Sequence, residues 1–120
     1  MIRLKRAFEG PFDEDGYRVL VDRLWPRGVS REDAALDRWM KELAPSGELR
    51  RWFDHDPDRW EEFRERYWRE LDAKRELVEE VLRTAREGPL TLVYAAQDRE
   101  RNNAVALKEY LELQRTGDAQ

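Results

Sequence analysis

The chain has 120 residues, of which 42% are charged and 40% hydrophobic, and its formal net charge is −4. This length is typical of a single domain, so we expect residues 1–120 to form one. The 11% of aromatic residues and the small net charge argue against a disordered chain. Because the sequence has no Cys and a single His, it excludes disulfides, Cys-based metal sites and a multi-His metal site within one chain.

Composition also bears on location and partners. No apolar run approaches the roughly 20 residues of a membrane span, and residues 1–6 lack the apolar segment of a secretory signal. We therefore expect a cytoplasmic protein without a membrane partner. The acidic balance of charge disfavours nucleic acid as a partner, because nucleic-acid-binding domains are usually basic. The sequence does not indicate an oligomeric state.

Three segments are predicted to be strands. Residues 2–8 form a short one, and residues 17–24 carry a nearly continuous apolar run, typical of a strand covered on both faces. Residues 90–95 form the third. The first two strands are separated by only eight residues, 9–16. Since a parallel crossover usually needs a dozen or more residues, these two strands are predicted to be antiparallel neighbours.

Helical spacing of apolar residues predicts the helices. The first covers about 30–44 and a short second one about 46–53. A long helical stretch covers 56–86, either as one helix or as two with a break near Asp72, and a last helix follows residue 101. The residues that cap or end these helices are Ser30, Pro45, Ser46, Asp56, Pro57, Gly88 and Pro89.

These elements predict a small mixed α/β sheet of three to four strands packed with helices. The strand at 17–24, the helices and the strand at 90–95 form a β–helices–β crossover, which joins parallel strands. Ligands of open α/β sheets bind beyond the carboxyl ends of such strands. The side chains that follow these two strands should therefore lie side by side around a binding site.

The segment after the first of these strand ends is locally basic. Residues 17–31 carry four Arg and one acid, Asp22. Arg23 and Arg27, with Trp25 between them and a helix start at Ser30, suit a phosphate or carboxylate ligand, because guanidinium groups and helix N–H groups both favour anions. The alternative is that these two arginines pair with neighbouring acids.

The second strand end supplies Tyr94, Asp98, Asn102 and Asn103 as candidates. Asp98 either caps the last helix, or acts as a general base or a metal ligand. The two asparagines either close the end of the helix or donate their amides to a ligand. Each of these alternatives stays open at this point.

The one histidine, His55, lies between Asp54 and Asp56. Flanking carboxylates favour its protonated form, which suits a proton carrier. The alternative is a structural role between two helices.

Several motifs resemble the YeaO-like family, which is part of domain-of-unknown-function family 488. They are RVLVDRLWPRG at 18–28, WFDHDP at 52–57, TLVYA at 91–95 and the pair Asn102-Asn103. The resemblance implies a small cytoplasmic bacterial protein of α/β type with one domain, and it implies no particular reaction. Some relatives in the wider group carry a Cys-His-Arg motif after the last strand. Because this chain has the two asparagines and no Cys there, thiol chemistry is not carried over.

The leading hypothesis is a pocket at the strand ends that binds, and could act on, a small anionic ligand. Asp22 and Asp98 would be its acid–base carboxylates with His55 in reserve, and the ligand would contact Arg23, Arg27, Arg50, Trp25, Tyr94, Asn102 and Asn103. The alternative is a non-enzymatic module that binds nucleic acid or protein through the arginines of 17–31. The sequence has no Gly-rich dinucleotide loop, and it does not indicate which cofactor, if any, the protein binds.

Overall fold

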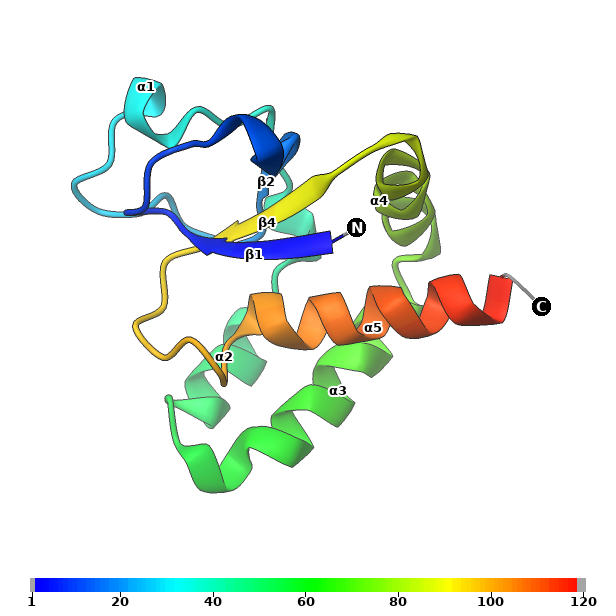
Figure 1. The fold of residues 1–120 in the computed structure, drawn as a ribbon. Helices are drawn as coiled ribbons and strands as arrows, with labels where there is room; N and C mark the ends of the chain where they lie inside the picture. Colours follow the sequence, from blue (N-terminus) through cyan, green and yellow to red (C-terminus); the bar gives the residue numbers. More distant parts are fainter. Residues whose placement is uncertain (1, 119–120) are drawn as a thin grey trace.

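The computed structural model describes residues 2–118. It has four strands, five α-helices and three short 3-10 turns (Figure 1). The strands are β1 (Ile2–Arg6), β2 (Tyr17–Leu20), β3 (Arg38–Trp39) and β4 (Leu90–Tyr94), and the helices are α1 (Arg31–Ala34), α2 (Gly47–Phe53), α3 (Trp60–Asp72), α4 (Arg75–Glu87) and α5 (Asn103–Asp118).

The sheet has the order β1-β4-β2-β3, and each of its pairings is parallel. The α/β class and the parallel crossover from β2 to β4 are confirmed. The antiparallel pairing of the first two strands is wrong, because β4 lies between them. The connection from β1 to β2 must cross two strand spacings, roughly 10 Å, because β4 lies between these strands. It must also run back the length of a strand, roughly 15 Å, so that β2 starts at the same end of the sheet as β1. The ten residues 7–16 can span that distance because both strands are short.

The helix predicted over 30–44 is also wrong. Ser30 caps α1 as expected, since its Oγ accepts the Asp33 N–H at 3.0 Å, but the helix ends after four residues. Ala35 then takes a left-handed conformation, with φ of 48°. The Asp37 carboxylate accepts the Arg18 N–H at 2.8 Å, which brings the chain alongside β2 as the short edge strand β3. Pairing with the sheet therefore overrides the helical spacing.

The remaining helices follow the expectation. Ser46 caps α2 and Asp56 caps the 3-10 turn Pro57–Arg59 that leads into α3. The long helical stretch is two helices, because α3 ends at Asp72 and α4 begins at Arg75. Their apolar stripe is buried as predicted, at Phe63, Tyr67, Leu71, Val78, Val81, Leu82 and Ala85.

The two faces of the sheet are covered differently. Helices α2, α3, α4 and α5 pack on the face that carries Val19, Leu90 and Leu92, where the main core lies. On the other face, where α1 lies in Figure 1, Leu20 and Val93 pack under Trp25 and Trp39.

A buried ion network adjoins this second cluster. The Asp15 carboxylate accepts from the Lys5 ammonium at 3.0 Å and from the Arg18 guanidinium at 2.7 Å. Burial of Asp15 acts to raise its pKa, but the Phe12 N–H and these two cations together hold the pKa below its ordinary value. Arg18 also donates to the carbonyls of Ala34 and Ala35. The Arg18 guanidinium is therefore bound to groups of the protein itself.

Candidate functional site

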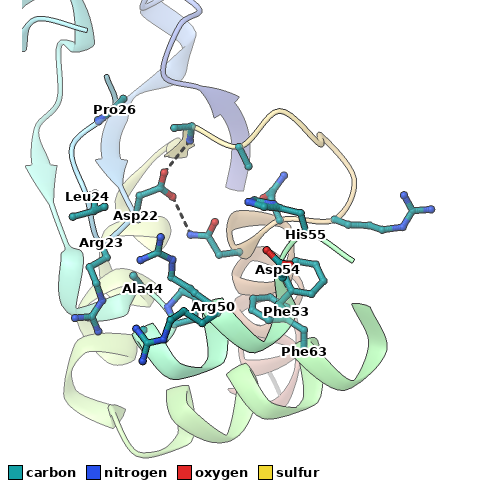
Figure 2. Close-up of a pocket in the computed structure, with 18 of the residues that line it drawn as sticks. Asp22, Arg23, Leu24, Pro26, Ala44, Arg50, Phe53, Asp54, His55 and Phe63 are labelled. Atoms are coloured by element: carbon teal, nitrogen blue, oxygen red, sulfur yellow. Dashed lines mark hydrogen bonds between the residues drawn. The ribbon is translucent and has the colours of Figure 1, made fainter. Parts of the chain in front are cut away.

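The carboxyl ends of β2 and β4 meet at Asp22. One carboxylate oxygen of Asp22 accepts the Ala95 N–H at 2.9 Å, just after β4, and the other accepts from the Asn103 amide at 3.1 Å, at the start of α5 (Figure 2). Asn103 also donates to the carbonyl of Val21. Asp22 from the first predicted set and Asn103 from the second thus lie side by side, as the parallel crossover requires.

A cavity of about 580 Å³ opens at this edge of the sheet. Its walls come from the segment after β2, from α2 and the turn that follows it, and from the loop before α5. The polar lining residues are Asp22, Arg23, Arg27, Arg50, Arg51, Asp54, His55, Arg101, Asn102 and Asn103, and the apolar ones include Leu24, Trp25, Pro26, Phe53 and Phe63.

The lining is strongly cationic, with five arginines against two aspartates. Within residues 2–118, the guanidinium groups of four of them make no hydrogen bond or ion pair; these are Arg23, Arg27, Arg50 and Arg51. The fifth, Arg101, lies 3.6 Å from Asp98. The alternative in which Arg23 and Arg27 pair with neighbouring acids is therefore not what the fold adopts.

Asp22 is a half-buried residue that lines this cationic cavity. Burial raises the pKa of its carboxyl, although the bonds from Asn103 and Ala95 and the charge of Arg50 act in the opposite direction. A buried carboxyl that gains a proton more readily than usual can serve as an acid or a base. Its two hydrogen bonds also tie the ends of β2, β4 and α5 together, so it is a structural residue as well.

The two asparagines close the start of α5. Asn102 is buried, its amide oxygen accepts the Val105 N–H at 2.9 Å, and its amide nitrogen donates to the carbonyl of Asp98 at 2.8 Å. Asn103 donates to the end of β2, as described above. Both border the cavity, but their amide nitrogens already have partners in the fold.

Two predicted site residues do not line the cavity. The Asp98 carboxylate accepts the N–H groups of Glu100 and Arg101, and these bonds lower its pKa. It thus closes the loop before α5, which is one of the two alternatives considered for it. Tyr94 is 2% exposed and belongs to the core on the helical face, where burial raises the pKa of its hydroxyl.

His55 borders the cavity on the turn after α2, where Figure 2 shows it beside Asp54 and Phe53. Both Asp54 and His55 have left-handed backbones, with φ of 47° and 54°. The other flanking acid, Asp56, instead caps the following turn by accepting the Asp58 N–H. Of the two carboxylates considered beside the imidazole, Asp54 is the one that shares the cavity with it.

Sequence reasoning missed Arg51, Asp54 and Arg101 as lining residues. The adjacent run Arg50-Arg51 was a signal for the first, but its use requires knowing that α2 faces the strand ends. Conversely, Arg18 is 3% exposed and paired on the opposite face, so the basic segment 17–31 presents fewer free charges than its composition suggests.

Two negative findings apply to the described part of the chain. Within residues 2–118, no group of three or more His, Asp or Glu side chains is placed to hold a metal ion. Among those same residues, no helix combines the length and the apolar character needed to cross a membrane.

The fold and the cavity define an all-parallel α/β domain with an arginine-lined hollow at the carboxyl ends of its strands. The chain belongs to the DUF488 family, since residues 1–119 match the family model described as "Inactive DUF488-N3 subclade". It is 42% identical over 110 residues to "Uncharacterized protein YeaO" of Escherichia coli, which covers 92% of this chain and 96% of that one. It is 40% identical over 110 residues to "Uncharacterized protein Rv3073c" of Mycobacterium tuberculosis, covering 92% of each. No solved structure shows a significant match.

Proposed function

We propose that the cavity at the strand ends binds a small anionic ligand through a phosphate or carboxylate group, and that Arg23, Arg27 and Arg50 hold that group. One observation carries the proposal: four guanidinium groups line one cavity, and within the described chain none of them makes a hydrogen bond or an ion pair. Like charges in one place repel each other, and a bound anion offsets that cost while accepting paired N–H bonds.

The proposal favours binding over turnover. The matching family model is described as an inactive subclade, which supports a role without a chemical step. Asp22 and His55 are then polar groups of the cavity wall, and Asp98 has no direct part because it does not line the cavity. Tyr94 acts only through the core below the site.

The test is binding of inorganic phosphate and of acetate, measured by calorimetry and by thermal shift. Arg50→Ala and Arg23→Ala should each weaken the affinity about tenfold, since a hydrogen bond to a charged group contributes about 1.5–3 kcal/mol. Both side chains are exposed and make no hydrogen bond or ion pair within the described chain, so the melting temperature without ligand should hardly change.

The matched control is Arg83→Ala, which removes an exposed arginine of α4 that does not line the cavity. The proposal is wrong if neither anion binds saturably to the unsubstituted protein, or if Arg83→Ala weakens binding as much as Arg50→Ala. Asp22→Asn is a poorer probe, because an amide cannot accept both of the hydrogen bonds that Asp22 receives.

A further inference from the structure

We infer that the ligand of this cavity carries an apolar body of aromatic-ring size beside its anionic group, and that this body lies against Leu24. The inference rests on the anion site proposed above and adds the chemical class of the molecule. Organic phosphates and carboxylates of metabolite size belong to that class, whereas inorganic ions do not.

The first argument is the size of the cavity. Its volume of about 580 Å³ falls in the range of roughly 300–1,000 Å³ that is usual for sites of small organic molecules. A lone phosphate or carboxylate at the arginines would leave most of this space to water. A larger ligand would fill it.

The second argument is the apolar side chain at its wall. Leu24 is 66% exposed, more than any other large hydrophobic residue in the described part of the chain. A single exposed leucine is ordinary in itself. Of the large exposed hydrophobic residues in that part, however, Leu24 is the one that lines the cavity, and it stands between two of the unpaired arginines, Arg23 and Arg27.

The third argument is that the backbone presenting Leu24 is held on both sides. The carbonyl of Asp22 accepts the indole N–H of Trp39 at 2.8 Å, and the indole N–H of Trp25 donates to the carbonyl of Val29 at 2.7 Å. The two indole rings pack edge to face, with centroids 5.6 Å apart. Hydrogen bonds at Asp22 and Trp25 therefore fix the segment that carries Leu24. Exposed Phe8 and Phe12 differ in that a cation covers each ring.

The arrangement assigns separate roles to neighbouring side chains. The arginines that precede and follow Leu24 in the chain bind the charged group, and Leu24 removes the apolar body from water. An uncharged aromatic molecule would lack the first contact, and a small anion would lack the second.

The experiment compares ligands that share a charged group and differ in the body. We would measure the affinities of methyl phosphate and phenyl phosphate, and of acetate and benzoate, for the unsubstituted protein, for Leu24→Ser and for the control Leu113→Ser. Leu113 is also an exposed leucine, 57% accessible, but lies on α5 outside the cavity lining. Phenol serves as the uncharged probe.

We expect the aromatic member of at least one pair to bind about tenfold more tightly than its small partner, because it buries apolar surface. Leu24→Ser should remove most of this preference and leave the affinity for the small anion unchanged. Leu113→Ser should change neither. The phosphate and carboxylate pairs show which charged group the site prefers.

Two results would overturn the inference while leaving the anion site intact. In the first, methyl and phenyl phosphate bind equally well, as do acetate and benzoate. In the second, the aromatic preference survives in Leu24→Ser. If no anion binds, or if phenol binds as tightly as phenyl phosphate, the proposed anion site itself fails.

Discussion

At the scale of single residues, the turn after α2 is strained next to the cavity. Asp54 ends the helix in a left-handed conformation and its N–H donates to the carbonyl of Arg50, a position where glycine is common. His55 continues in the same left-handed region. For residues other than glycine this conformation costs about 1–2 kcal/mol. The two left-handed residues reverse the direction of the chain after α2, and both of their side chains border the cavity.

This strain predicts a difference between two variants of His55. His55→Gly should have a free energy of unfolding about 1 kcal/mol higher than His55→Ala, because glycine adopts a positive φ without a steric penalty. Both variants lack the imidazole, so the loss of this side chain does not contribute to the difference. Urea unfolding of the two proteins measures it, and equal stabilities would mean that the backbone at residue 55 is unstrained.

The side chains whose positions could be predicted from the sequence are those fixed by topology. Asp22 and Asn103 come together because β2 and β4 are parallel neighbours, which the crossover implies. Tyr94 was misplaced because strand side chains alternate: it shares the buried helical face with Leu90 and Leu92. Arg51 could not be assigned, since its place depends on how α2 packs in three dimensions.

At the scale of elements, α2 carries the second group of arginines and α3 holds it in place. The Glu70 carboxylate on α3 accepts both the N–H and the hydroxyl of Ser46, at 2.8 and 2.7 Å. The same Ser46 hydroxyl caps the first turn of α2. The position of Arg50 therefore depends on a carboxylate that does not line the cavity.

Glu70→Ala should lower the free energy of unfolding by about 2 kcal/mol, because two hydrogen bonds to a charged acceptor are lost. It should also weaken phosphate binding, since α2 then loses its fixed position relative to the strand ends. Glu70→Gln keeps one acceptor and should lie between. Denaturant unfolding and calorimetry measure the two effects. Exposed Glu65 on the same helix is the matched control, and an equal loss in Glu65→Ala would contradict the proposed docking role.

Elements were predicted well where local signals and packing agree. The caps at Ser46 and Asp56 and the buried stripe of α3 and α4 satisfy both, so these helices fall close to their expected positions. The helix prediction for residues 30–44 failed because contacts with Arg18, which is distant in the sequence, decide their structure. The Arg18 side chain donates to the carbonyls of Ala34 and Ala35, and the Arg18 backbone N–H donates to the Asp37 carboxylate. Such contacts leave no periodic trace in the sequence.

At the scale of the whole molecule, the order of the strands makes the fold depend on the segment from β4 to α5, near the end of the chain. Strand β4 is fully buried and lies between β1 and β2, although it follows both in the chain. Within the described sheet, β1 pairs with β4 alone, and β2 otherwise pairs only with the two residues of β3. The β2–β4 junction is also the edge on which Asp22 and the cavity are built.

A fragment of residues 1–88 should therefore fail to fold, even though it contains three of the four strands of the described sheet and the helices α1 to α4. Without β4 and α5, the strand β1 has no hydrogen-bonding partner and the apolar face of the sheet is incomplete, so the remaining burial cannot offset the entropy of ordering the chain. Near-ultraviolet circular dichroism and amide chemical-shift dispersion should both be lost, whereas residues 1–115 should unfold in one cooperative transition. A dispersed spectrum with cooperative unfolding of 1–88 would show that the sheet forms without its central strand.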